Sequence, residues 1–305
     1  WITIINKICM IFGVPHRSKS GWNFLSHGLR FQIFILVAAI FVFLWTIIPF
    51  FWMFWASLMT EAELVQGIVQ MIDKPTLGHY WRIFGIAETD ALSGGQTKQL
   101  SLALLNSFIV ALPTAIISTA IAMLAGYAFG RFTFPGQRTL LFTLLLTRVL
   151  PPIAILIPYY AFFQSIGMIG THASLILTYL PGITPLIAWL LMGYFATLPV
   201  NVERAARIDG CSRLQALWHV IIPMALPGIS AAFIIAFLFA WNELLFAIIL
   251  TGGSSAQTLS PSLQAISQNV VLLTAASTLS VIPPFLLALF FQKFITRLNV
   301  VDPTT

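Results

Sequence analysis

The sequence predicts an all-α, polytopic membrane protein with six transmembrane helices and a short cytoplasmic helix between the fourth and the fifth. Of the 305 residues, 59% are hydrophobic and only 8% are charged, whereas a soluble domain carries roughly 25% charged residues. So few charges cannot cover a water-facing surface of this size, and we expect most of the surface to face lipid. Six apolar segments are also long enough to cross a bilayer, which takes about 20 residues in a helix. They run over 31–58, 103–129, 139–165, 173–195, 224–250 and 274–296.

Each of these spans is expected to be helical, because backbone polar groups find no water partner in lipid. Prolines inside the spans then predict kinks, which membrane helices tolerate where neighbouring groups satisfy the freed carbonyls. These prolines are Pro49, Pro113, Pro151, Pro152, Pro158, Pro181 and Pro185.

The chain divides into four predicted parts. Residues 1–30 form a cytoplasmic or interfacial segment, and 31–100 hold the first span with a long outer loop. Residues 101–297 form the transmembrane core, and 298–305 a cytoplasmic tail. Trp1 is not an initiator methionine, and the sequence that follows has no signal-peptide pattern.

Lysine and arginine placement predicts the orientation, because basic residues gather in cytoplasmic loops. With the N-terminus inside, the outer segments hold only Lys74, Arg82 and Lys98. The inner segments hold Lys7, Arg17, Lys19, Arg30, Arg131, Arg138, Arg204, Arg207, Arg213, Lys293 and Arg297. Both termini and the 196–223 loop are therefore expected in the cytoplasm.

Several function classes are disfavoured. The net charge of +6 is scattered among short loops, so it does not predict a nucleic-acid surface. Cys9 and Cys211 both fall on the cytoplasmic side, where a disulfide is not expected. The five histidines show no metal-ligand spacing, and no nucleophile–base set or carboxylate pair is evident. We expect no active site, metal or cofactor in this chain.

The 196–223 loop predicts two short helices joined at a glycine. Asn201 is a candidate N-cap and Glu203 suits the first turn of a helix. Ala205 and Ala206 favour a helix without adding bulk. A stop at Gly210 is followed by a second helix over roughly 212–222 that leads to Pro223.

This loop resembles the "EAA" loop of ATP-binding-cassette (ABC) importer permeases, on which the ATPase docks. The family pattern is Glu-Ala-Ala, three residues, Gly, nine residues, then Ile-x-Leu-Pro. The matching positions here are Arg204-Ala205-Ala206, Gly210 and 220–223. Arg204 stands where the family has glutamate, and Glu203 lies one place earlier, about 100° round the helix. We expect Glu203 to take the place of that glutamate.

Further motifs resemble the carbohydrate-uptake branch, the maltose and glycerol-phosphate type. They are TLGHYWRIF (76–84), Asn106-Ser107, GYAFGRFTFPGQR (126–138), Tyr159-Tyr160, Gly193-Tyr194-Phe195 and Trp241-Asn242-Glu243. The likeness covers roughly residues 31–297. The C-terminus departs from it, because it ends in NVVDPTT rather than in the family's Gly-Ala-Val-Lys-Gly tail.

The resemblance implies one permease subunit of a binding-protein-dependent sugar importer. It implies a second, related permease subunit, two ATPase subunits that bind ATP and Mg²⁺, and an external substrate-binding protein. The residues expected to couple to the ATPase are Glu203, Arg204, Ala205, Ala206, Asp209, Gly210 and Pro223.

Two charges lie within predicted spans, where a charge normally faces a cavity or a partner. They are Glu243 in the fifth span and Arg148 in the third, and a pair between them is one hypothesis. The other is that Trp241, Asn242 and Glu243 face the substrate path, and the resemblance adds Asn106 and Tyr159. Structural hydrogen bonds between helices explain the same residues equally well.

Two other patterns carry little weight. Residues 92–96 read LSGGQ, the signature of ABC ATPases, but the chain has no G-x-x-x-x-G-K-[ST] loop to hold phosphates. We interpret it as a turn in an outer loop. Gly126 and Gly130 have the spacing of close helix contacts, which is common by chance.

Two alternative functions remain. A secondary active transporter for a small polar solute would favour inverted repeats and more titratable groups within the spans, and no clear repeat is present. An integral-membrane enzyme would need clustered His, Asp or Glu at a membrane face, and the sequence has no such cluster.

Overall fold

A computed structural model of the protein describes residues 29–66, 75–86 and 94–295. The predicted interfacial segment with Cys9, the predicted tail 298–305 and the first two residues of LSGGQ lie outside these ranges. All regular secondary structure in the described part is helical, as predicted. The helices are α2 (Leu29–Ala56), α3 (Glu61–Gln66), α4 (Gly78–Ile83), α5 (Gly94–Arg131), α6 (Gln137–Leu146), α7 (Pro152–Ser165), α8 (His172–Thr197), α9 (Val200–Ile208), α10 (Arg213–Ala216), η2 (Leu217–Ile221), α11 (Ile222–Trp241), α12 (Leu245–Thr251), α13 (Leu259–Ala265) and α14 (Val270–Ile295).

Five helices of the described part are long and apolar enough to cross a membrane. They match the first, second, fourth and sixth predicted spans and the first part of the fifth. The predicted third span, 139–165, is instead two shorter helices, α6 and α7. The break spans residues 147–151, directly before Pro152. Prolines donate no backbone hydrogen bond and disfavour helical geometry in the residue before them.

The fifth predicted span, 224–250, is also interrupted, between α11 and α12. No proline lies at this break. Asn242 donates a side-chain hydrogen bond to the carbonyl of Leu238 at 2.9 Å. The Glu243 carboxylate accepts the N–H groups of Phe246 at 2.9 Å and Ala247 at 3.1 Å. These side chains offer the backbone partners that a continuous helix would otherwise supply.

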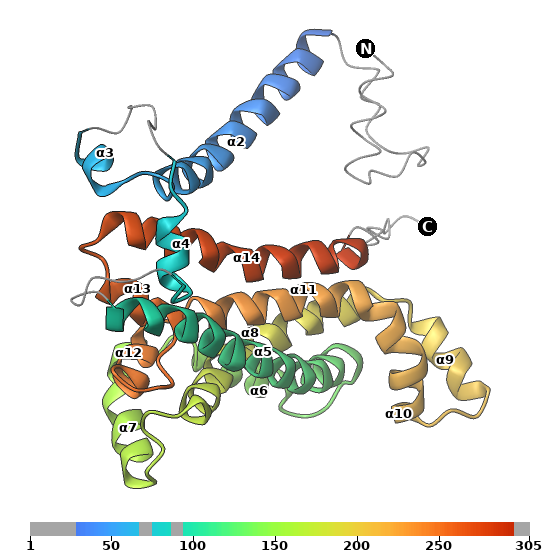
Figure 1. Cartoon of the computed structure of the whole chain (residues 1–305). Coiled ribbons are helices and arrows are strands. Elements are labelled where there is room, and N and C mark those ends of the chain that lie inside the picture. Colours follow the sequence, from blue (N-terminus) through green and yellow to red (C-terminus); the bar gives the residue numbers. More distant parts are fainter. Residues whose placement is uncertain (1–28, 67–74, 87–93, 296–305) are drawn as a thin grey trace.

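The long helices pack side by side, and α5 and α8 form the central pair (Figure 1). α5 packs most extensively on α8, α11 lies across both, α14 packs on α11, and α2 contacts α14. The hairpin of α9 and α10 lies at one end of this bundle, whereas α4, α12 and α13 lie at the other (Figure 1). The hairpin predicted to be cytoplasmic and α4 of the predicted outer loop therefore lie at opposite ends of the bundle (Figure 1).

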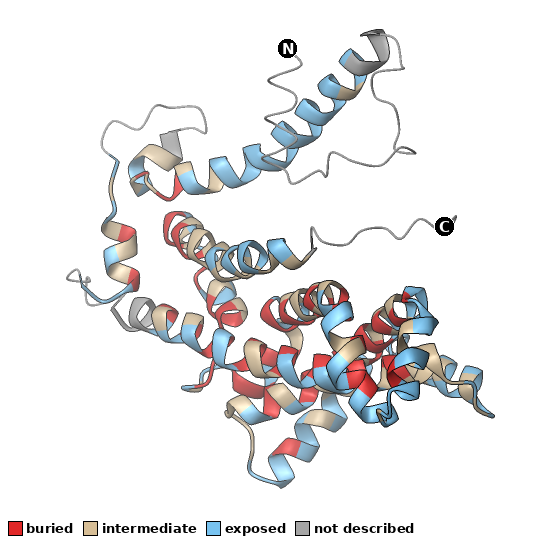
Figure 2. Ribbon diagram, turned by 90° about the vertical axis from the view of Figure 1, so that its right-hand side faces the viewer, coloured by how far each residue is buried: buried red, intermediate tan, exposed pale blue. Residues whose placement is uncertain are grey.

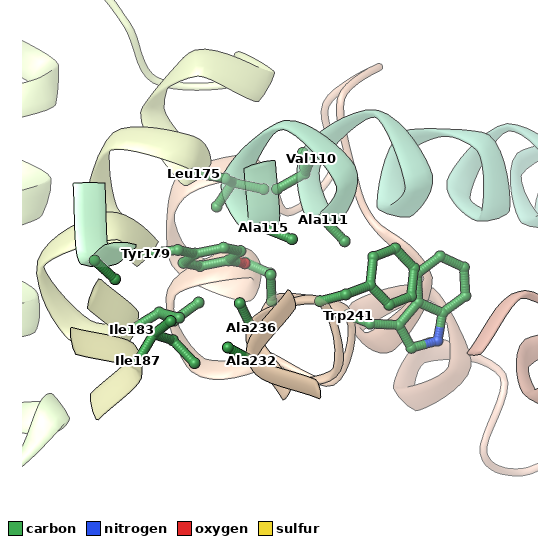
Figure 3. Packing of buried hydrophobic residues seen from close by; sticks show 14 of the residues in the cluster. Val110, Ala111, Ala115, Leu175, Tyr179, Ile183, Ile187, Ala232, Ala236 and Trp241 are labelled. Carbon is green, nitrogen blue, oxygen red and sulfur yellow. The ribbon is translucent and has the colours of Figure 1, made fainter. Parts of the chain in front are cut away.

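The buried core lies among α5, α8 and α11, and α2 is mostly exposed (Figure 2). Small residues make the central contact close. Ala111 and Ala115 of α5 face Ala232 and Ala236 of α11, beside Tyr179 of α8 (Figure 3). Alanines at such spacing let membrane helices approach, which favours van der Waals packing where lipid supplies no hydrophobic drive.

The Gly126–Gly130 pair belongs to this packing. A Cβ on Gly126 would lie 2.9 Å from the backbone nitrogen of Met192 in α8. A Cβ on Gly130 would lie 2.8 Å from the carbonyl oxygen of Met192. Both glycines therefore permit backbone contact between α5 and α8.

We expect Gly126→Ala to destabilise the protein by about 1–3 kcal/mol, because the new methyl group forces two packed helices apart. Gly193→Ala on α8 is the matched control, since a Cβ there meets nothing within 4 Å. Thermal unfolding in detergent measures both variants. Equal melting temperatures for the two would contradict the assigned contact.

Candidate functional site

The segment after α8 folds as a helical hairpin. Its first helix, α9, ends before Gly210, whose φ of +94° lies in a region that residues with a Cβ rarely adopt. Ser212 then caps α10. Its hydroxyl accepts the N–H of Gln215 at 3.3 Å, and the Gln215 side chain accepts the N–H of Ser212 at 2.8 Å. The predicted arrangement of helix, glycine and helix is present.

One detail of this prediction is wrong. Asn201 does not cap α9, because the helix begins at Val200 and Pro199 occupies the cap position. The predicted second helix, 212–222, corresponds to α10 and the π-helical turn η2, and α11 follows them without a break. The wider π turn directly precedes Pro223, where a regular turn would bring the proline ring against a carbonyl.

The candidate coupling residues divide between two faces of the hairpin. Ala206 is buried, as are Ala216 and Leu217 across the hairpin. The candidates on the open surface are Arg204, Ala205, Asp209, Gly210 and Pro223. Ile208, which was not a candidate, is 85% exposed beside them.

Glu203 points into the protein rather than outward. Its Oε1 accepts a hydrogen bond from the Tyr127 hydroxyl at 2.7 Å. Its Oε2 lies 3.5 Å from Nε of Arg131, and the side chains of Arg131 and Glu203 are only 3% and 12% exposed. Arg131 also donates to the carbonyl of Leu198 at 3.0 Å. The carboxylate therefore ties α9 to the end of α5, and an ATPase contact through Glu203 stays a prediction.

Sequence reasoning missed Tyr127 and Arg131 as functional partners. Both lie in the GYAFGR segment that closes the second predicted span. A basic residue at the end of a transmembrane helix, beside an acidic residue in the next cytoplasmic loop, was the available signal. The 3.6-residue period alone placed Glu203 on a different face from Arg204 but did not say which partner it meets.

A second candidate site is a cavity of about 550 Å³ beside the two helix breaks. Tyr159 of α7 and Glu243 line it, together with Arg148 and Tyr179. An adjoining cavity of about 590 Å³ is lined by Asn242 and Glu243. Of the candidate path residues, Tyr159 and Glu243 therefore line the first cavity, and Asn242 and Glu243 line the adjoining one. The interrupted helices leave room that a straight helix would fill.

Trp241 and Asn106 lie elsewhere. Trp241 is 5% exposed and stacks on Phe237 in the core, with ring centroids 5.4 Å apart (Figure 3). Asn106 donates to the carbonyls of Ser255 at 2.8 Å and Gln257 at 2.9 Å, and its oxygen meets His172. These contacts of Asn106 hold the loop before α13 in place, and Trp241 packs in the core. Both residues therefore stabilise this conformation, and a role of either in the substrate path stays a prediction.

The hypothesis of a Glu243–Arg148 pair is wrong for this structure. Both Glu243 oxygens accept backbone N–H groups of α12. The Arg148 guanidinium instead donates to the carbonyl of Gly182 and lies 5.2 Å from the centre of the Phe239 ring. The two charges line the same cavity without forming an ion pair.

Comparison with known proteins places the chain among transport components. The family model for "binding-protein-dependent transport system inner membrane component" matches residues 118–298. A sulfoquinovosyl glycerol transport permease of Agrobacterium fabrum is 30% identical, over 80% of this chain and 84% of that protein. A trehalose transport permease of Mycobacterium tuberculosis is 34% identical, over 70% and 74%.

A further relative is the maltose/maltodextrin transport permease of Vibrio vulnificus, 30% identical over 88% of this chain and 94% of that protein. Among solved structures, a chain of a bacterial ABC transporter that imports the acidic polysaccharide alginate has a TM-score of 0.65. It is 21% identical and covers 88% of this chain and 98% of its own length. That likeness supports the fold.

Proposed function

Since the chain belongs to the family of binding-protein-dependent transport system inner membrane components, we propose that it forms half of the translocation path of an ATP-driven carbohydrate importer. It is a multi-pass inner-membrane protein of the ABC permease type. The carbohydrate assignment rests on relatives named for sulfoquinovosyl glycerol, trehalose and maltose transport.

The proposed assembly has five chains. A second, related permease subunit completes the path, two ATPase subunits bind ATP and Mg²⁺, and an external binding protein delivers the sugar. This chain is the non-catalytic part, with both termini in the cytoplasm. A solved complex of an alginate transporter with its periplasmic protein resembles the chain at a TM-score of 0.55 and supports this fold in such an assembly.

The observation that carries the proposal is the hairpin of α9 and α10. It lies at one end of the bundle, beyond the long helices (Figure 1), and Ala205 and Ile208 are exposed there. Short helices that expose small and apolar residues fit a groove on a partner. ATP-driven closure of the ATPase pair would push this hairpin, and its contacts would carry the motion into the membrane.

The cavity at the two helix breaks is the proposed part of the sugar path. Aromatic faces and hydrogen-bonding groups line it, including Tyr159, Tyr179 and Arg148. Such a lining suits sugars, whose CH faces stack on rings while hydroxyls take hydrogen bonds. Rocking of the helices between inward and outward states would then open the cavity to either side.

Copurification tests the proposal. The tagged chain, expressed with a second permease subunit, an ATPase subunit and a binding protein from the same organism, is expected to retain the ATPase and to support ATP-dependent sugar uptake in vesicles. A secondary transporter would instead take up its solute without ATPase or nucleotide. Uptake by the chain alone, driven by an ion gradient, would overturn the proposal.

A further inference from the structure

Four arginines surround one small cavity beneath the hairpin. Its volume is about 280 Å³, and its lining includes Arg131, Arg204, Arg207 and Arg213. Glu203 is the acid that lines the same cavity. Four positive side chains around one negative side chain leave a strong positive potential, which favours an anionic group inside.

Arg131 carries an unsatisfied donor at this cavity. Its side chain is 3% exposed, and its Nη2 is buried without a hydrogen-bond partner. Nε lies 3.5 Å from Glu203 but does not make a well-aligned hydrogen bond. A buried guanidinium donor without a partner is costly, so the geometry favours an acceptor arriving from outside the chain.

The other three arginines open toward the surface of the hairpin. Arg204 and Arg207 are exposed on α9. Arg213, at the start of α10, is exposed and lies 5.0 Å from the centre of the Phe132 ring. The large apolar side chains of Ile208 and Leu214 are 85% and 60% exposed on the same hairpin. Charged and apolar exposure together is typical of an interface that a partner covers.

We propose that this arginine cavity receives a carboxylate side chain of the docked ATPase. The inference rests on the proposed function and adds which partner carries the positive and which the negative charge at the contact. Glu203 is held by Tyr127 and Arg131 within the chain, so it does not neutralise Arg204. Guanidinium groups bind carboxylates through paired hydrogen bonds that an ammonium cannot reproduce. In this contact the ATPase therefore supplies the negative carboxylate, and the hairpin supplies the positive guanidinium groups.

Charge reversal tests the contact. We expect Arg204→Glu to weaken ATPase retention by about thirty-fold or more, the range seen when one member of a desolvated interface charge pair is lost. An acidic residue of the ATPase groove changed to arginine should restore retention with Arg204→Glu and weaken it with the unchanged chain. ATPase retention by Arg204→Lys should lie between that of the unchanged chain and that of Arg204→Glu.

Arg138→Glu is the matched control, because it makes the same charge change at an exposed position outside the cavity. It is expected to retain the ATPase fully. Retention by the Arg204→Glu variant equal to that of this control, with no rescuing change in the ATPase, would overturn the proposal.

Two further binding measurements test whether the cavity holds a phosphate group instead of a carboxylate. If inorganic phosphate, or vesicles of phosphatidylglycerol, bind the chain without ATPase and the Arg204→Glu change removes that binding, the cavity holds a phosphate group and the proposal is wrong. If the unchanged chain retains no ATPase at all, the proposed function fails as well.

Discussion

Ala205→Trp is expected to abolish ATP-driven uptake while the chain still folds and inserts into the membrane. Ala205 lies on the exposed face of α9, between Arg204 and the buried Ala206. An indole there leaves the core intact but prevents close approach of a partner to the hairpin. Disruption of a central interface contact costs about 2 kcal/mol when the residue is a hot spot, so ATPase retention should fall by about thirty-fold. Uptake of labelled sugar into vesicles measures the effect.

Two variants make the test specific. Ala205→Ser keeps the side chain small and is expected to transport normally. Thr139→Trp adds the same bulk at an exposed position of α6, outside the hairpin, and is also expected to transport. Normal uptake by Ala205→Trp would place the ATPase contact elsewhere. Equal loss in Thr139→Trp would indicate a general effect of bulk on the exposed surface.

Much of the fold followed from the sequence, because hydropathy and helix length depend on local composition. The first, second, fourth and sixth predicted spans each match one long helix. The hairpin was predicted as well, since a stop at Gly210 between two polar helical segments is a local signal. The way in which α10 continues into α11 was not predicted, because it depends on a π-helical turn that no residue pattern in the sequence indicates.

The helix breaks show where local reasoning ends. The prolines in the third span predicted a kink, but the separation into α6 and α7 was not predicted. In the fifth span the Glu243 carboxylate accepts two backbone N–H groups at the start of α12. The sequence predicted that the Glu243 carboxylate faces either the substrate path or a partner charge. Glu243 lines a cavity, and its bonds to backbone N–H groups give it a structural role at the same time.

Contacts between distant segments account for the rest. Tyr127 and Glu203 lie 76 positions apart in the chain, so their contact depends on how α5 and α8 pack. That packing depends in turn on Gly126 and Gly130, whose pattern is too common to be informative alone. The direction of Glu203 therefore became clear only from the assembled bundle.

Glu203→Ala is expected to lower the stability of the cytoplasmic end of the bundle and to uncouple ATP hydrolysis from transport. The change leaves Arg131, which is 3% exposed, without its counter-charge. Breaking a buried ion pair by removing one partner costs about 3–5 kcal/mol, which corresponds to a fall in melting temperature of roughly 10 °C for a chain of this size. The Tyr127 hydroxyl also loses its acceptor.

A double variant separates stability from coupling. Replacing the pair by apolar residues, with Arg131→Met and Glu203→Leu, removes the unpaired charge, so the melting temperature should recover most of its value. If the pair carries motion from α9 into α5, the ratio of sugar transported to ATP hydrolysed should stay low in this variant. A double variant that regains both stability and a normal ratio would show that the pair only holds the fold together, because apolar packing would then transmit the motion equally well.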